Sequence, residues 1–337
     1  MDWQNLQQRA KEKFQGSCRV CPVCNGVACA GEVPGMGGIG TGSSFKKNIE
    51  SLADYQLNMR TIHSATEPNL ACELLGMKLV APILAAPIGG ISLNMRGAMT
   101  EEEYCEAVVA GCRQAQIAAM TGDGPSPIVF ESGLKALAAH SGFTIPTIKP
   151  RQNEIIIDMA QRAAAAGAPA FAVDIDAAAL VNMTKAGQPV GPKSAKDLKI
   201  IKRNTSIPFI IKGIMTPDEA ELCAEAGVDA IVVSNHGGRC LDHTPGAADV
   251  LPLICDAVED DIIVFVDGGI RSGADILKML ALGADAVLIG RPLAIAAVGG
   301  GAEGVAWMIQ KWAAELRAAM IMTGMADVRD VNDEIFW

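Results

Sequence analysis

The chain has 337 residues, of which 50% are hydrophobic and 4% aromatic, and this is enough to bury a large core in one domain. Its formal net charge of −10 at pH 7 argues against a nucleic-acid partner, because a surface that binds phosphates needs clustered Lys and Arg. The first residues show no basic stretch followed by an apolar core, and no apolar run is long and unbroken enough to span a bilayer. We therefore expect a cytoplasmic protein with no membrane partner.

The N-terminal part of the chain differs in composition from the rest. Residues 2–14 carry apolar side chains at helical spacing, which predicts a short amphipathic helix. A cysteine-rich stretch, residues 18–29, follows, and then a glycine-rich stretch, residues 35–42, that cannot be regular helix or strand for long. We therefore divide the chain into an N-terminal helix and Cys/Gly-rich extension, residues 1–43, and a main domain, residues 44–337.

Ten cysteines in a chain without an export signal favour reduced thiols. Four of them stand apart with the spacing C-x2-C-x2-C-x4-C: Cys18, Cys21, Cys24 and Cys29. Four thiolates could bind zinc tetrahedrally or hold an iron–sulfur cluster. Redox-active thiols and inert thiols are the alternatives. We favour a metal or cluster, because closely spaced cysteines point in different directions and cannot all fill a core.

The main domain starts with a helix and irregular pieces over residues 44–78, and then becomes regular. Apolar runs predict eight buried strands: 80–88, 116–121, 143–149, 170–176, 207–214, 230–234, 262–267 and 286–289. Alanine-rich stretches predict eight helices between and after them: 101–115, 126–139, 153–166, 193–203, 217–226, 246–258, 272–282 and 303–320. Eight alternating strands and helices imply an α/β fold, a (β/α)8 TIM barrel. A doubly wound open sheet is the alternative, but no G-x-G-x-x-G follows the first strand.

Polar residues follow several strands at their C-terminal ends, where parallel α/β folds build their sites. The run Ile231–Val233 breaks into a turn with two glycines that carries His236 and Arg239. A histidine can move a proton near neutral pH, and an arginine can hold a carboxylate with two hydrogen bonds. Asp174 and Asp176 end the fourth strand in the same way.

Lys212 lies inside the apolar fifth strand, where a lone charge is costly. A structural ion pair with Asp174 or Asp176 is one explanation, and a bound anion or electron-rich cofactor is the explanation that we favour. Glycines and arginines follow the seventh and eighth strands, the usual phosphate site of this barrel: Gly269, Arg271, Gly290 and Arg291. Glycine amides and arginines are the donors that a phosphomonoester needs.

Three motifs in this sequence resemble those of a known family. Residues 234–242 resemble the His and Arg signature of the FMN-dependent α-hydroxy acid oxidase/dehydrogenase family, which includes glycolate oxidase and lactate oxidase. Residues 267–292 resemble its flavin-phosphate segment, and residues 73–89 resemble its first-strand flavin contact. The resemblance covers residues 44–325, and it implies an FMN cofactor across the mouth of the barrel.

The resemblance implies a role for each residue that matches a family position. The implied cofactor contacts are Ala86, Pro87, Ile88, Thr121, Asp174, Lys212, Ser234, Asp267, Gly269, Arg271, Gly290 and Arg291. His236 would act as the base, Asp176 would hold its imidazole, and Lys212 would lie near flavin N1. Arg239 would bind the substrate carboxylate, with His236 and Met183 completing the substrate site.

The chain departs from the family pattern on the substrate side. Two family tyrosines fall on Glu32 and Pro146, a second substrate arginine falls on Met183, and a flavin-contacting threonine becomes Asp174. Half of the usual carboxylate clamp is therefore missing, which predicts a substrate with an apolar or bulky side chain.

The expected reaction is oxidation of a 2-hydroxy acid to a 2-oxo acid, with flavin N5 accepting the hydride, in a protein that forms a homo-oligomer. One alternative is an FMN-dependent isomerase resembling type 2 isopentenyl diphosphate isomerase. The other is a low-turnover flavin or metal redox sensor.

Overall fold

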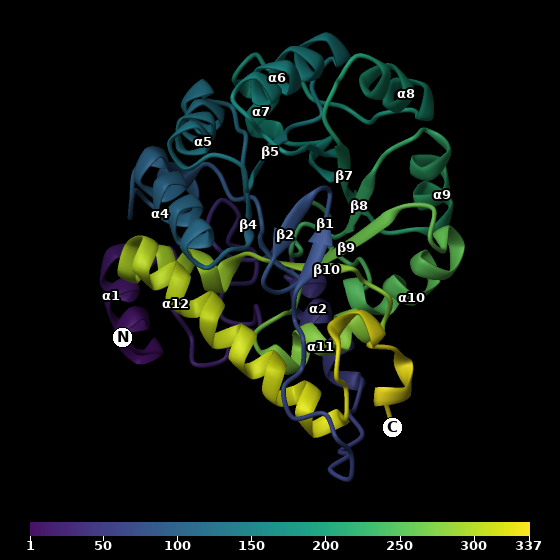
Figure 1. The fold of residues 1–337 in the computed structure, drawn as a ribbon. Helices are drawn as coiled ribbons and strands as arrows, with labels where there is room; N and C mark the ends of the chain where they lie inside the picture. The colour runs from purple at the N-terminus through teal and green to yellow at the C-terminus, as the bar shows by residue number, and fades with distance from the viewer.

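The computed structural model describes residues 1–337, except for the side chain of Val181. Eight parallel strands close into a barrel in the order β10-β3-β4-β5-β6-β7-β8-β9, and β9 pairs with β10 to complete it (Figure 1). The strands are β3 Ile83–Ala85, β4 Ala118–Thr121, β5 Thr144–Ile148, β6 Phe171–Asp174, β7 Phe209–Ile214, β8 Ala230–Val233, β9 Ile263–Asp267 and β10 Ala286–Ile289. The predicted (β/α)8 barrel is confirmed, and each strand lies within the run that predicted it.

A ring of helices surrounds the strands (Figure 1). These helices are α4 Glu101–Gln114, α5 Pro127–His140, α6 Asn153–Ala165, α8 Ala195–Arg203, α9 Pro217–Glu225, α10 Ala247–Val258, α11 Gly273–Ala281 and α12 Arg291–Thr323. Short helices α3 Ile91–Asn94 and α7 Val181–Lys185 lie in the loops after β3 and β6. A kink at Gly301, with φ 59° and ψ −149°, divides α12 into two helical parts, and the predicted helix 303–320 lies in the second part. The first part, from Arg291, was not predicted, and Pro292 in its first turn suits a helix start.

Helix α12 is long and apolar enough to cross a membrane by length and composition, which the sequence pattern did not suggest. However, 72% of its most apolar window is buried inside the protein. It packs against α4 and against the N-terminal helix α1 Trp3–Phe14 (Figure 1). Gly299 allows the close approach of α1, because a Cβ there would lie 2.2 Å from the backbone oxygen of Leu6. Gly111 on α4 does the same for that helix, because a Cβ there would lie 2.6 Å from the backbone oxygen of Ala302. Its apolar character is thus explained by burial.

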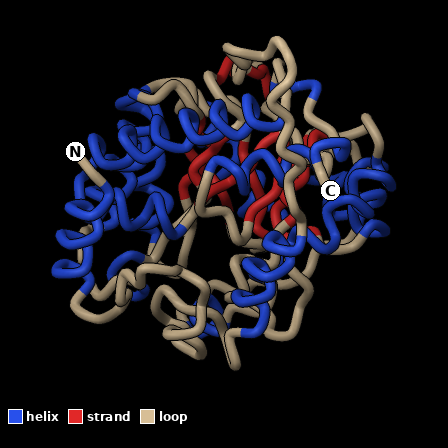
Figure 2. The backbone as a smooth tube through the Cα atoms, turned by 90° about the horizontal axis from the view of Figure 1, so that it is seen from below, coloured by secondary structure: helices blue, strands red, loops and turns tan.

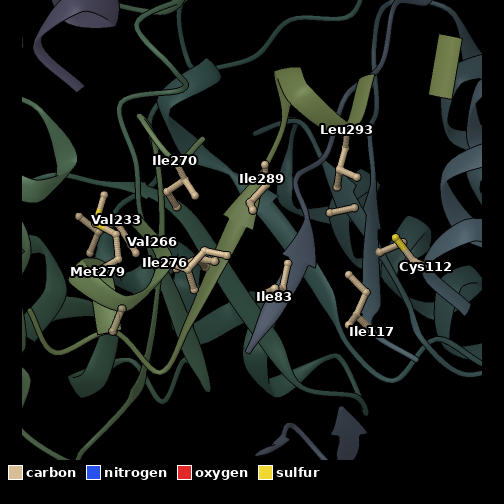
Figure 3. Packing of buried hydrophobic residues seen from close by; sticks show 14 of the residues in the cluster. Ile83, Cys112, Ile117, Val233, Val266, Ile270, Ile276, Met279, Ile289 and Leu293 are labelled. Carbon is tan, nitrogen blue, oxygen red and sulfur yellow. The ribbon is translucent and has the colours of Figure 1, made fainter. Parts of the chain in front are cut away.

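Side chains alternate along each barrel strand and form two core layers. The outward-facing residues pack against the helices, and Figure 3 shows part of this layer, including Ile83 and Ile289. The inward-facing residues fill the barrel together with Leu74, Met77 and Leu79. These three come from a two-stranded hairpin, β1 Cys72–Leu74 and β2 Met77–Leu79, that the sequence pattern left irregular. The hairpin closes the N-terminal end of the barrel, opposite the end with most of the loops (Figure 2).

The rest of the N-terminal extension crosses the open end of the barrel. Residues 15–42 contain turns and isolated bridges but no regular element, as the glycine pattern predicts. Helix α2 Ser43–Asp54 then packs under the loop after β8. A Cβ at Gly238 would lie 2.3 Å from the backbone nitrogen of Phe45, so only glycine fits this crossing.

Candidate active site

The alternation of the strands carries polar side chains into the top layer of the barrel. On β7 and β6, Ile210 and Ala172 face the interior, and Lys212 and Asp174 follow two residues later on the same face. Asp267 stands at the same level on β9. Because these residues end inward-facing series of apolar side chains, the fold directs them toward the mouth of the barrel.

A cavity of about 350 Å³ opens over this layer, which is within the size range of cofactor and ligand sites. Its wall contains most of the predicted site residues: Ala86, Pro87, Ile88, Asp174, Met183, Lys212, His236, Arg239, Asp267, Arg271, Gly290 and Arg291. Residues 33–36 of the N-terminal extension also contribute to the wall. The structure therefore gathers at one place residues that lie more than 250 positions apart in the chain.

Four predicted residues do not line this cavity. Thr121 is buried and packs against Gly133 of α5, so its side chain faces away from the cavity. Gly269 lies against the backbone of Asn48, and its neighbour Gly268 takes its place in the wall. Thr121 and Gly269 thus lie outside the cavity wall in this structure. The other two do not reach the cavity but contact residues that line it: Ser234 is bonded to Lys212, and Asp176 is bonded to His236.

Lys212 is buried and lies among three carboxylates. Its Nζ atom is 3.4 Å from Asp267 Oδ2, 3.5 Å from Asp174 Oδ1 and 3.9 Å from Asp176 Oδ2. It also donates to Ser234 Oγ at 2.9 Å, and Ser234 donates to Asp267 Oδ1 at 2.7 Å. Burial lowers the pKa of Lys212, but the three carboxylates outweigh it and the pKa is raised. Lys212 is therefore a fixed positive charge beside the cavity, and the structural ion pair that the sequence left open is present.

His236 lies on a strained turn at the edge of the cavity. Three successive residues, His236, Gly237 and Gly238, have φ of 58°, 62° and 73°, and the first is unusual for a residue with a side chain. The turn places His236 Nδ1 2.7 Å from Asp176 Oδ1 and 3.4 Å from Asp174 Oδ1. Burial lowers the pKa of His236, but Asp174 and Asp176 outweigh it and hold the pKa well above 6.5.

Arg239, Arg271 and Arg291 form a cationic group that has no acidic partner. Among the described side chains, none of the three has a carboxylate within 4.0 Å. Burial, together with the charges of Arg239 and Arg271, lowers the pKa of Arg291 to about 9. Three partly buried guanidiniums without a carboxylate partner favour a bound anion, because the anion would compensate their positive charge.

Backbone carbonyl groups of the N-terminal extension hold these arginines in place. Arg239 Nη1 donates to the oxygens of Gly35 and Gly37, at 2.6 and 3.0 Å. Arg291 donates to the oxygens of Met36 and Gly37, at 2.8 and 3.2 Å. Arg271 reaches the oxygen of Cys24 through Nε and Nη2, at 3.2 and 3.1 Å. The extension is thus part of the site.

A profile of the FMN-dependent dehydrogenase family matches residues 35–188 and 186–337. This chain belongs to the FMN-dependent dehydrogenase family. An L-lactate dehydrogenase of Caulobacter vibrioides is 30% identical over 89% of this chain and 91% of that protein. A 2-hydroxyacid oxidase of Dictyostelium discoideum is 46% identical over 141 residues, which span 42% of this chain and only 36% of that protein. The crystal structure of mandelate oxidase with (S)-2-phenylpropionate has 27% identity and a TM-score of 0.81, and covers 98% of this chain and 96% of that one.

The cavity of this FMN-dependent dehydrogenase fits its cofactor. FMN carries a phosphate dianion, and Arg271 and Arg291 have N–H groups beside the cavity but no carboxylate to pair with. The reduced ring carries negative charge, and Lys212 is a buried cation at the cavity wall. The predicted cofactor therefore agrees with the donors that the structure supplies.

Lys149 is the main residue of this site that the sequence reasoning missed. Its side chain lines the cavity and its Nζ lies 2.5 Å from Asp174 Oδ2. The signal was in the sequence, because Lys149 ends the third apolar run and stands on the same face as Ile145 and Thr147. Asn94 was missed as well, since its contact with Arg239 comes from the short helix α3.

The four N-terminal cysteines do not form a tetrahedral metal site in this structure. Zinc–sulfur bonds of about 2.3 Å would bring four sulfurs to within about 3.8 Å of one another. In the described chain, no three of the sulfurs of Cys18, Cys21, Cys24 and Cys29 lie within 4.8 Å. Burial raises the pKa of Cys18 to about 11. The prediction of a mononuclear zinc site is therefore not supported by the arrangement of these side chains.

Proposed function

We propose that this protein oxidises a 2-hydroxy acid to the corresponding 2-oxo acid, with FMN as the electron acceptor. The observation that carries the proposal is a single cavity that holds both a histidine–carboxylate pair and an arginine with no acidic partner. The first is suited to removing a proton, and the second is suited to binding a carboxylate. The names of the relatives, 2-hydroxyacid oxidase, L-lactate dehydrogenase and mandelate oxidase, support the same class of substrate.

Bound FMN supplies a two-electron acceptor. Arg271 and Arg291 would hold its phosphate, with backbone groups of Gly268 and Gly290 in the same part of the wall. Lys212 would place its positive charge near the ring edge where charge collects on reduction. Ala86, with Pro87 and Ile88 after it, presents the end of β3 to the cavity and would lie against the ring.

His236 is the proposed base. Its Nδ1 atom donates to Asp176 Oδ1, so Nε2 is the atom that can accept a proton from the substrate. Oxidation of the alcohol carbon to a carbonyl removes two electrons and two protons. One proton would go to Nε2, and the other would leave with both electrons as the hydride equivalent that FMN accepts. Asp176 fixes the ring and stabilises the imidazolium that forms, as a carboxylate does beside a catalytic histidine.

Several apolar side chains line the cavity together with polar ones such as Asn94 and Asp123, and they support a substrate with a bulky apolar side chain. Apolar residues that line it are Val33, Met36, Leu93, Ile128, Val129, Leu180 and Met183. Arg239 would bind the carboxylate. Lys149, another cation in the wall, is held by Asp174 and is a weaker candidate for the same task.

Anaerobic mixing of the purified yellow protein with a panel of 2-hydroxy acids tests the proposal. We expect the flavin absorbance near its visible maximum to bleach with at least one of them, and acid release to yield FMN rather than FAD. A protein that neither contains nor binds FMN, or an FMN-loaded protein that no 2-hydroxy acid reduces, would contradict it. Turnover of an isopentenyl diphosphate without net bleaching would instead favour the isomerase alternative.

We also propose that the four N-terminal cysteines hold an iron–sulfur cluster rather than a zinc ion. The four thiols lie within twelve residues of the extension, and each is partly buried. A [4Fe–4S] cluster suits thiols that are near but not in mutual contact, because each thiolate then binds a different iron. Self-association into a homo-oligomer stays a prediction that light scattering can check.

A further inference from the structure

His236 faces two carboxylates, although it has only one N–H on that side. Asp176 Oδ1 lies 2.7 Å from Nδ1 and takes the direct hydrogen bond. Asp174 Oδ1 lies 3.4 Å from the same nitrogen, is buried, and has no hydrogen-bond partner. An unpaired buried carboxylate oxygen is costly unless a positive charge lies close to it. Lys212, whose Nζ lies 3.5 Å from this oxygen, is one such charge, and the protonated imidazole of His236 would be a second.

Asp174 is fixed at this position by a lysine from the neighbouring strand. Lys149, just past the end of β5, contacts the other oxygen, Oδ2, at 2.5 Å. Lys212 lies 3.5 Å from Oδ1. Asp174 therefore cannot turn away from His236 without breaking the contact with Lys149.

The charges in this layer balance when it holds one additional proton, and the imidazole of His236, bonded to Asp176, can carry that proton. Two lysines, Lys149 and Lys212, face three carboxylates, those of Asp174, Asp176 and Asp267. The layer is mostly buried, so an uncompensated negative charge is unfavourable. A proton on the imidazole removes the imbalance.

We propose that Asp174, held by Lys149, is a positioning residue that stabilises the protonated form of His236 and so strengthens it as a base toward the substrate. This inference rests on the proposed function. A proton that leaves the substrate for Nε2 enters a site where two carboxylates, rather than one, face the resulting imidazolium. The consequence is a faster proton transfer once the imidazole is neutral, and a need for higher pH to make it neutral.

All but one of the groups that face the imidazole favour its protonated form. Asp174 and Asp176 at the end of β6 favour its protonation, as does Cys240 in its own loop, and Lys212 on β7 opposes it. Lys149 on β5 acts through Asp174. Burial raises the pKa of Asp174, but the imidazole and both lysines outweigh it and hold the pKa well below its usual range. Asp174 is thus charged throughout the working range.

The test measures the protonation of His236 directly, by NMR, in protein with and without FMN. The chain has only four histidines, so the ring signals can be assigned with His236→Gln. Asp174→Asn removes the charge and keeps the shape, and Asp174→Thr serves as a second variant if the first does not fold. Asp285→Asn is the matched control, because this partly buried carboxylate accepts from Val264 N, near the start of β9.

In the FMN-free protein, we expect Asp174→Asn to lower the pKa of His236 by at least about one unit, a tenfold loss of proton affinity. The control variant should leave it unchanged. In the loaded enzyme, the pH at which flavin reduction reaches half of its plateau should fall by a similar amount, and the plateau itself should fall several-fold. An unchanged His236 titration in both folded variants would overturn the inference, and so would a shifted titration with an unchanged pH profile. A wild-type enzyme that no 2-hydroxy acid reduces would refute the proposed function instead.

Discussion

Arg239 donates a hydrogen bond of 2.6 Å to the carbonyl oxygen of Gly35, which lies 204 positions earlier in the chain. Two more bonds, to Gly37 O and Asn94 Oδ1, are each 3.0 Å long. A guanidinium has five N–H groups, so these three bonds leave two for a substrate carboxylate. The N-terminal extension thereby orients the arginine that the substrate needs.

We expect long or aromatic 2-hydroxy acids to have a higher kcat/KM than glycolate. Met183 stands where the family resemblance implies a second arginine for the substrate carboxylate. Loss of such a charged donor weakens the binding free energy by about 1.5–3 kcal/mol. Burial of an apolar side chain against this part of the wall offsets that loss at about 25 cal/mol per Å². Arg239→Met should remove most of the activity, and a steady-state side-chain series measures both effects. Glycolate as the best substrate would show that polar groups replace the missing clamp.

Arg291→Met should weaken FMN binding by about 10-fold to 100-fold, because it removes a charged donor from the group without acidic partners. Fluorescence titration of the FMN-free protein measures the change. The control is Arg329→Met, whose side chain is 70% exposed and pairs with Asp327 far from the cavity. Equal affinities for the two variants would mean that the phosphate lies elsewhere.

His236→Ala should keep bound FMN but slow flavin reduction by at least about a hundredfold, the usual contribution of a general base. The physical reason is that alanine has no nitrogen to accept the substrate proton and cannot form the hydrogen bond by which Asp176 orients the base. Stopped-flow bleaching with a saturating substrate provides the rate. A near-normal rate in this variant would assign the base to another residue.

The protein prepared without oxygen should contain iron and show a broad visible absorption beyond that of the flavin. Cys21→Ser and Cys24→Ser should lose both, because each removes one of four thiolates. Cys72→Ser, outside the extension, is the control. Less than about 0.2 equivalents of iron in the wild type, a stoichiometry far below the one cluster that four thiolates bind, would favour free thiols.

Lys212→Met should destabilise the FMN-free protein by about 3–5 kcal/mol, because three carboxylates lose their buried cation. The loss should shrink as the pH falls, because burial and the charge of Asp174 raise the pKa of Asp176, and protonation of Asp176 removes one of the charges that need the cation. Urea unfolding at two pH values tests both statements. The control Lys202→Met breaks a half-exposed pair with Asp229 and should cost at most about 1 kcal/mol. Equal losses for the two variants would contradict the buried network.

The fold was largely predictable because strands and helices leave local patterns of apolar residues in the sequence. Runs such as residues 207–214 are apolar on both faces, and alanine-rich stretches separate them, so a barrel of parallel strands was the natural solution. The same local pattern placed Lys212 and the turn at His236 at strand ends. The hairpin β1–β2 was missed because each of its strands has only three residues.

By itself, the sequence determined the barrel, the FMN family and the positions of His236, Lys212 and Arg239, because each depends on neighbours within a few residues. Only the tertiary structure decided which carboxylates face His236, that Lys149 holds Asp174, and that the oxygen of Gly35 fixes Arg239. It also showed that the cysteines of the extension do not gather as a zinc site would require. These contacts join residues that only closure of the barrel and the crossing of its mouth bring together, and no local pattern encodes such distances.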